Sequence, residues 1–234
     1  MTATFDLPFF LAEAKAASGP VLELMAGTGR VSLPLVEAGV ALTCVDASAE
    51  MLSRLREKLA GRRMQAQVVQ ADVRTLDLGQ SFDLAILPFN SFSELAEPAD
   101  QERALAAIHR HLRPGATFIC TLHNPSVRRR SADGQPRLVG RYPLDDGTLL
   151  LWSAARCVAD GGLVEGVQVY EEYDSEGMLR RQRMLDMRFA LIERADFERR
   201  AAAAGFRVTE LYGDYDRSPF LPETSPYIIW TLRR

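Results

Sequence analysis

Lysine is almost absent from this chain of 234 amino acids: it occurs only at Lys15 and Lys58, and arginine supplies the remaining positive charge. The formal net charge is −3 at pH 7, so acidic residues outnumber basic ones. A chain without a global positive field attracts neither nucleic acid nor an anionic membrane. The charge balance therefore favours a small molecule as partner and makes nucleic acid an unexpected one.

Cysteines and long apolar runs are also scarce. Cys44, Cys120 and Cys157 lie in separate apolar stretches with no CxxC spacing and no nearby histidine pair, which is typical of reduced core residues and predicts no metal site. The first 19 residues include Asp6, lack a cationic start and have too short an apolar run for a signal peptide or membrane span. A cytoplasmic protein is expected.

Apolar runs of strand length alternate with helical patterns in the first half of the chain. The runs are VLELM (21–25), ALTCVD (41–46), AQVVQAD (66–72), FDLAILPF (82–89) and TFICTLH (117–123). Nearly continuous apolar strands are expected to be covered on both faces. Between them, Met51, Leu52, Leu55 and Leu59 form a helical stripe after a cap at Ser48. The order predicts an α/β fold, a Rossmann-like doubly wound and mostly parallel sheet, with a ligand crevice at the carboxyl ends of its strands.

The pattern changes after Asn124. Four segments alternate polar and apolar residues, and turn signals separate them at residues 145–147, 160–162 and 175–177. A helix follows over residues 193–204 and stops at Gly205, and residues 126–137 read as a loose segment. The sequence predicts an antiparallel β insertion after the fifth strand, within a single domain of residues 1–234.

The stretch VLELMAGTGR (21–30) joins an apolar strand to a glycine-rich turn. Such a turn presents backbone N–H groups and a helix N-terminus to a ligand pressed against the backbone. Residues 27–32 also approximate the GxGxxG pattern of dinucleotide sites, but Ser32 stands at the third glycine and a lone match is weak.

Three carboxylates discriminate between the candidate ligands. Glu23 lies in the first strand, Asp46 ends the second and Asp72 ends the third, so one rim of the sheet is expected to carry all three. That rim repels a diphosphate, whereas a sulfonium, an α-amino group, ribose hydroxyls and an adenine amine each offer an acid a donor or a positive charge. S-adenosylmethionine carries these groups. Any one acid could instead be satisfied by loop N–H groups.

These motifs resemble those of the class I S-adenosylmethionine-dependent methyltransferases, along nearly the whole chain. VLELMAGTGR resembles the first motif of the family, CVDASAEML the acidic end of the second strand, and VVQADV the adenine-contacting motif. FDLAILPFNSF resembles the fourth-strand motif, HLRPGATF the turn before strand five, and AGFRVTELYGDYDRSPF the closing element. The chain departs from the family at Met25, where a glycine is usual. Its thioether either packs beside the methionine tail of the cofactor or weakens binding.

The resemblance implies S-adenosylmethionine as cofactor and a role for each matching residue. Glu23 orders the turn and the amino-acid end, and Asp46 binds the ribose hydroxyls. Asp72 and the Val73 N–H contact adenine, Met51 packs on its face, and the Leu87 carbonyl receives the amino group. The expected cofactor set is Glu23, Met25, Ala26, Gly27, Gly29, Arg30, Asp46, Ala47, Met51, Asp72, Val73 and Leu87.

The acceptor side has weaker signals. His123, at the end of the fifth strand, is the candidate general base, and a hydrogen-bonded structural histidine is the other interpretation. Asn90 and Ser91 either bind a polar acceptor or form a simple turn. Phe9 and Phe10 either close over the cofactor as a lid or pack on the core.

In glycine and amino-sugar N-methyltransferases, which the chain resembles, a comparable insertion roofs the acceptor site or makes a dimer contact. This implies that residues 125–192 form a substrate-side subdomain, with Tyr142 and Tyr170 as acceptor contacts and a homodimer as one option. The alternating residues fit a plain two-faced sheet equally well. The basic cluster at residues 128–130 is interpreted as a charged flexible loop rather than an RNA contact.

The sequence thus predicts an enzyme that transfers a methyl group from S-adenosylmethionine to a nitrogen or oxygen of a small polar metabolite. Two other functions stay open. A non-catalytic S-adenosylmethionine-binding or RNA-interaction module would keep Asp46 and Asp72 but lack an enclosed acceptor pocket. An NAD-linked reductase is disfavoured by Ser32 and by the acidic rim.

Overall fold

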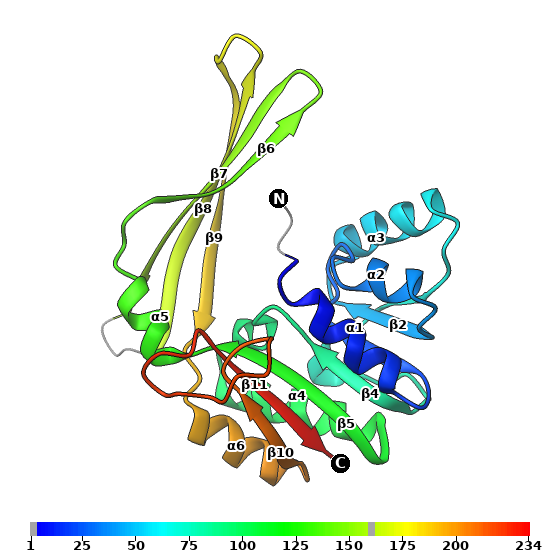
Figure 1. The fold of residues 1–234 in the computed structure, drawn as a ribbon. Coiled ribbons are helices and arrows are strands. Elements are labelled where there is room, and N and C mark those ends of the chain that lie inside the picture. Colours follow the sequence, from blue (N-terminus) through cyan, green and yellow to red (C-terminus); the bar gives the residue numbers. More distant parts are fainter. Residues whose placement is uncertain (1–3, 159–161) are drawn as a thin grey trace.

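The computed structural model describes residues 4–158 and 162–234, which form two β-sheets and their covering helices (Figure 1). The central sheet has seven strands in the order β10-β11-β5-β4-β1-β2-β3. Their bounds are β1 (Val21–Leu24), β2 (Leu42–Asp46), β3 (Gln67–Gln70), β4 (Phe82–Leu87), β5 (Leu112–His123), β10 (Arg207–Tyr212) and β11 (Tyr227–Arg233). Strands β1 to β5 pair in parallel, and β11 pairs antiparallel to both β5 and β10. The predicted doubly wound, mostly parallel sheet is confirmed.

Burial of the strands follows their place in the sheet. All four residues of β1 are buried because β1 lies between β2 and β4 and is covered on both faces. Strand β3 is at the edge, and Gln67 and Gln70 at its two ends are exposed. Its inner residues Val68 and Val69 are half-buried and pack against the cores on the two opposite faces, so β3 is covered on both faces only in part.

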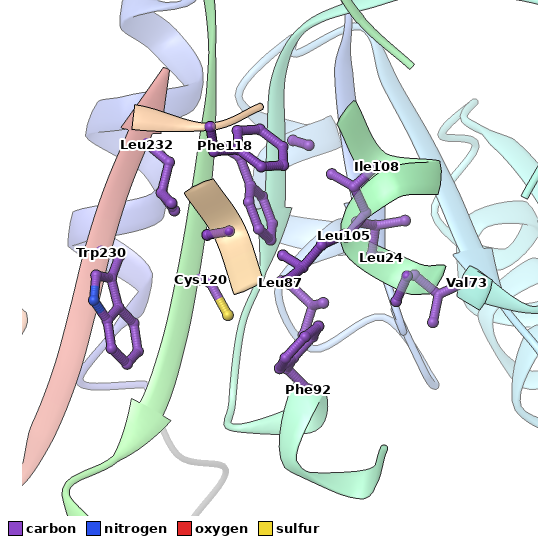
Figure 2. Close-up of a cluster of buried hydrophobic side chains, with 14 of the residues drawn as sticks. Leu24, Val73, Leu87, Phe92, Leu105, Ile108, Phe118, Cys120, Trp230 and Leu232 are labelled. Carbon is purple, nitrogen blue, oxygen red and sulfur yellow. The ribbon is translucent and has the colours of Figure 1, made fainter. Parts of the chain in front are cut away.

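Helices cover both faces of the central sheet. One layer contains α1 (Leu7–Ala16), α2 (Ser32–Glu37) and α3 (Ala49–Gly61), and the other contains α4 (Pro98–Arg110) and α6 (Arg194–Ala203). Figure 2 shows the core on the α4 and α6 side, where Leu105 and Ile108 of α4 lie beside Phe118 of β5. Within residues 4–158 and 162–234, no helix is long and apolar enough to cross a lipid bilayer.

Helix α3 forms where the sequence predicted it. The Ser48 hydroxyl accepts a hydrogen bond of 3.3 Å from the Met51 N–H and caps the helix. Leu52, Leu55 and Leu59 are buried against the sheet as expected. Met51, predicted in the same stripe, is 48% exposed.

The second sheet contains β6 (Arg137–Leu144), β7 (Gly147–Cys157), β8 (Leu163–Asp174) and β9 (Leu179–Ala190), in that order and antiparallel throughout. It rises away from the central sheet (Figure 1). The antiparallel insertion is confirmed, with tight turns between β6 and β7 and between β8 and β9. In the turn signal at residues 160–162, Asp160 and Gly161 lie outside the described residues.

The segment expected to be loose is partly helical, so that expectation is wrong. Helix α5 (Pro125–Ser131) begins after Asn124, whose side chain accepts a hydrogen bond of 3.1 Å from the Ser126 N–H. The Asn124 amide also donates to the carbonyls of Pro222 and Ser225, both at 2.8 Å. These long-range bonds fix the start of the helix, and a local reading of the sequence could not detect them.

Two short 3-10 helices follow strands of the central sheet. η1 (Val73–Thr75) follows β3, and η2 (Ser91–Glu94) follows β4.

Candidate active site

A cavity of about 600 Å³ lies at the carboxyl ends of β1, β2 and β4. A crevice is expected at this place, because β1 pairs with β2 on one side and with β4 on the other. The strand order reverses there, which makes it a topological switch point of the sheet. Most of the predicted cofactor residues line it: Glu23, Met25, Ala26, Gly27, Arg30, Asp46, Ala47, Met51, Asp72 and Val73, together with Ser91 from the predicted acceptor set.

Six predicted residues are absent from the lining of this cavity. Gly29 and Leu87 are buried, Asn90 follows β4 directly after the lining residue Phe89, and His123 ends β5. The other two, Tyr142 on β6 and Tyr170 on β8, belong to the second sheet.

The glycine-rich turn after β1 has an unusual backbone. Gly27 and Gly29 have positive φ angles of 57° and 86°, as glycines in tight turns do. Met25, at the position where a glycine was expected, also has a positive φ of 53°. A side chain in this left-handed region is strained. A Cβ on Gly29 would lie 2.4 Å from Leu55 Cδ1, so the turn and α3 approach closely there.

Asp46 holds this turn in place. Its Oδ2 accepts from the Gly27 N–H and its Oδ1 accepts from the Ser48 N–H, both at 2.8 Å. The interpretation that a strand-end acid serves loop N–H groups is thus correct for Asp46. Each carboxylate oxygen can still accept a second hydrogen bond, so a ribose contact is compatible with this structural role.

Asp72 is paired with a cation that the sequence argument overlooked. The Arg74 Nε donates to both carboxylate oxygens of Asp72, at 2.9 and 3.0 Å, and Arg74 Nη1 donates to Asp100 at 2.7 Å. The hydrogen bond from the Arg74 side chain is the main cause that lowers the pKa of Asp72. Both Arg74 and Asp100 line the cavity.

Glu23 is 1% exposed and accepts a hydrogen bond of 2.6 Å from the Ser32 hydroxyl. Desolvation by burial raises its pKa to about 8, against the smaller effects of Ser32 and Arg30. Glu23 is therefore mostly protonated at pH 7. Because Asp72 is also paired with Arg74, the rim is less negative than the sequence argument assumed.

The segment after β4 is strained and carries an unsatisfied polar atom. Phe89 and Asn90 have consecutive positive φ angles of 60° and 62°. The Asn90 carbonyl offsets this strain by accepting from the Ser93 hydroxyl and N–H, at 2.7 and 2.9 Å. The Asn90 Oδ1 is buried without a hydrogen-bond partner in the described residues.

His123 contacts this segment. Its Nε2 lies 3.2 Å from the Asn90 Nδ2, and its ring stacks on Tyr227 with 5.5 Å between centroids. Desolvation, followed by the charge of Arg128, lowers the pKa of His123 to about 4. His123 is consequently neutral at physiological pH.

The N-terminal segment contributes residues that the sequence argument missed. Asp6 is fully buried and forms a bidentate ion pair with Arg30, and the Arg30 guanidinium lies 4.7 Å from the Phe89 ring centroid. Phe9 and Phe10 are 4% and 0% exposed, so they pack in the core and the lid interpretation is wrong for them. No local pattern marks Asp6, because its partner is 24 residues away.

Comparisons with known proteins agree with this geometry. Residues 21–115 match the family model described as a methyltransferase domain. The glycine/sarcosine N-methyltransferase of Halorhodospira halochloris is 31% identical over 219 residues, which span 88% of this chain and 73% of that protein. The chain belongs to the class I S-adenosylmethionine-dependent methyltransferases.

Two further proteins are similar to this methyltransferase along most of its chain. The cypemycin N-terminal methyltransferase of a Streptomyces species is 28% identical over 214 residues, covering 89% of this chain and 81% of the relative. The structure of the CcbJ methyltransferase from Streptomyces caelestis matches with a TM-score of 0.80 and 27% identity, over 98% of this chain and 89% of that one. The enzyme therefore takes its methyl group from S-adenosylmethionine.

The cavity fits this cofactor. Its volume lies in the range typical of small-molecule sites. Gly27 leaves room for a ligand against the backbone, because a Cβ there would meet only the Met51 sulfur, at 3.6 Å. The Asp46 oxygens supply acceptors for hydroxyl groups.

Proposed function

We propose that this methyltransferase methylates an amine nitrogen of a small polar metabolite. The relatives support this proposal, since the two enzymes above are named as a cypemycin N-terminal methyltransferase and a glycine/sarcosine N-methyltransferase. The observation that carries it is the state of His123, whose pKa is lowered to about 4 mainly by burial.

A hydroxyl acceptor benefits from a general base, and a histidine with so low a pKa is a weak one. Asn90 also donates to the His123 Nε2 lone pair at 3.2 Å, so that nitrogen is engaged. A neutral amine needs no base before it attacks, and its product loses a proton to solvent. His123 then acts by holding Asn90 and the acceptor in position, rather than as a base.

S-adenosylmethionine supplies an electrophilic methyl group when bound, and the residues of the chain align and enclose it. We propose that the Gly27 and Gly29 backbone, Ala26, Ala47 and Met51 contact the cofactor, with Asp46 on the ribose and the Leu87 carbonyl on the amino group. We propose further that Asp72 and Val73 contact the adenine. Glu23 and Met25 then lie at the methionine end of the cofactor, and Arg30 forms part of the wall of the site. Alignment of this kind is worth roughly 7 to 11 kcal/mol in favourable systems.

We propose that residues 125–192, which contain the second sheet, form a substrate-side subdomain within a single domain. Tyr142 and Tyr170 of this sheet then contact the bound acceptor, together with Ser91 of η2.

One face of the second sheet carries an apolar row across its four strands: Leu138, Trp152, Val169 and Met184. Leu138 and Met184 are 48% and 67% exposed, and exposed apolar rows of this kind mark interfaces. We propose a second copy of the chain as the partner, with Met184→Glu expected to lower the mass measured by light scattering.

Matched nitrogen and oxygen acceptors test the main proposal. Formation of S-adenosylhomocysteine is measured with glycine against glycolate and with an amino sugar against its hydroxy analogue. We expect turnover with the amine member of a pair only. Methylation of the hydroxy member at an equal rate would refute nitrogen as the acceptor atom. A cytoplasmic location and the absence of a nucleic-acid partner stay predictions.

A further inference from the structure

Three consecutive arginines on α5 have different surroundings. Arg129 forms an ion pair with Glu193, and Arg130 lies 3.8 Å from the Glu223 carboxylate. The Arg128 guanidinium has no ion pair or hydrogen bond to any residue in 4–158 or 162–234. Its Nε is buried without a partner, and the group lies over the Phe189 ring at 5.3 Å from the centroid.

An arrangement of this kind is unfavourable unless a ligand completes it. A guanidinium stays charged at any physiological pH, and taking it out of water without a hydrogen-bonded anion costs free energy. Phe189 offsets only part of that cost, since a cation–π contact does not satisfy the N–H donors. Arg137, the cation whose charge acts on Arg128, is itself paired with Asp133 at 2.8 and 2.6 Å. Arg128 thus differs from Arg129, Arg130 and Arg137 in having no carboxylate partner among residues 4–158 and 162–234.

Arg128 lies near the acceptor side of the active site. Its backbone N–H donates at 2.8 Å to the carbonyl of Asn124, the residue after His123, and the His123 Nε2 is 3.2 Å from the Asn90 Nδ2. The Asn90 Oδ1 is also buried without a hydrogen-bond partner among the described residues. The same region therefore offers an unmatched acceptor and an unmatched cationic donor. Residues 89 and 91, on either side of Asn90, line the cofactor cavity.

We propose that Arg128 binds an anionic group of the methyl acceptor, a carboxylate or a phosphate, while Asn90 Oδ1 accepts a hydrogen bond from the acceptor's amine. The planar fork of a guanidinium matches either anion in a bidentate contact. The substrate class is then an amine that also carries an anionic group. This inference rests on the proposed function of amine methylation.

Anion binding without turnover is the first test. The full-length protein, saturated with S-adenosylhomocysteine, is titrated with inorganic phosphate or with acetate at constant ionic strength, and the melting temperature is measured. A ligand of the native state raises this temperature with concentration. We expect the rise in the wild type and in Arg130→Gln, the matched control, and its loss in Arg128→Gln. The anion that raises the melting temperature, phosphate or acetate, indicates whether Arg128 binds a phosphate or a carboxylate group of the acceptor. An equal response of Arg128→Gln and wild type, or no response in the wild type, would refute the anion site.

Turnover of matched acceptors is the second test. Glycine is compared with glycinamide, and phosphoethanolamine with ethanolamine. We expect kcat/KM to favour the anionic member by about 10-fold to 100-fold, the usual range for a charged hydrogen bond. Arg128→Gln should remove this preference mainly through KM, Arg128→Lys should keep part of it, and Arg130→Gln should keep all of it.

The outcomes separate this inference from the proposed function. Equal use of both members by the wild type, or an equal loss for both in Arg128→Gln, would refute the role of Arg128. If no amine is methylated while the phosphate or acetate response still depends on Arg128, amine methylation fails and the anion site stands. S-adenosylhomocysteine binding, expected to be unchanged in Arg128→Gln, confirms that the variant is folded.

Discussion

Arg30 and Asp6 join through two parallel hydrogen bonds, Nη1 to Oδ1 at 2.6 Å and Nη2 to Oδ2 at 2.7 Å. The Asp6 side chain is fully buried, and the Arg30 side chain is 19% exposed. Asp6 precedes α1, and Arg30 lines the cofactor cavity. The pair therefore ties the N-terminal helix to the wall of the active site.

A double-mutant cycle on this pair should show strong coupling. Asp6→Asn removes the buried charge that pairs with the Arg30 guanidinium, so we expect the free energy of unfolding to fall by about 3 kcal/mol. Adding Arg30→Gln should cost less than the sum of the two single changes, with a coupling of roughly 1 to 3 kcal/mol. Urea denaturation of the four proteins measures it. Additive losses would show that the interaction between Asp6 and Arg30 contributes no coupling free energy to the stability of the protein.

Asp46 has a structural role and a proposed role in cofactor binding, so we expect its two variants to differ in cofactor affinity. Asp46→Ala removes the acceptors of the Gly27 and Ser48 N–H groups, while Asp46→Asn keeps one oxygen. We expect both variants to bind S-adenosylhomocysteine more weakly, Asp46→Ala more so, by about 10-fold to 100-fold. Calorimetric titration gives the dissociation constants. Wild-type affinity in both variants would place Asp46 outside the site.

Met25 should reveal its backbone strain through a comparison of two variants. Met25→Gly and Met25→Ala both lose the side-chain packing, but alanine retains the penalty of a positive φ and glycine does not. We expect Met25→Gly to be more stable than Met25→Ala by about 1 kcal/mol. Chemical denaturation of both tests this. Greater stability of the alanine variant would show that the turn changes its backbone when the side chain is lost.

Glu23 should make stability depend on pH. Burial raises its pKa from an ordinary value of 4.5 to about 8, so between these values the folded protein holds a proton that the unfolded chain has released. The free energy of unfolding should therefore fall as pH rises through this window, by at most about 1.4 kcal/mol per pH unit. Urea denaturation at several pH values, with Glu23→Gln as comparison, measures this contribution. A parallel pH dependence in the two proteins would mean that Glu23 does not titrate there.

His123 should not act as a base in the neutral range. Because its pKa is lowered to about 4, its protonation does not change between about pH 6 and 8. We expect the ratio of kcat for wild type and His123→Gln to be constant across that range at saturating acceptor. Thermal melts of both proteins serve as the folding control. A ratio that changes with a single ionisation near the ordinary histidine pKa would restore the general-base role.

Much of the fold could be predicted because its signals are local. The apolar runs at residues 21–25 and 82–89 are long enough to identify buried strands, and Ser48 with the Leu52 stripe marks a helix start and its buried face. Helix α5 could not be predicted, because Asn124 is held by carbonyls about 100 residues away along the chain. The exposure of β3 depended on which strand lies at the sheet edge.

For the site, the sequence by itself determined which carboxylates and glycines gather at the carboxyl ends of parallel strands, because strand order and motif spacing impose that arrangement. It did not determine their charge. Burial protonates Glu23, Arg74 neutralises Asp72, and desolvation with the nearby charge of Arg128 keeps His123 neutral. Protonation depends on dielectric surroundings and on partners distant in the chain, and only tertiary packing brings these together.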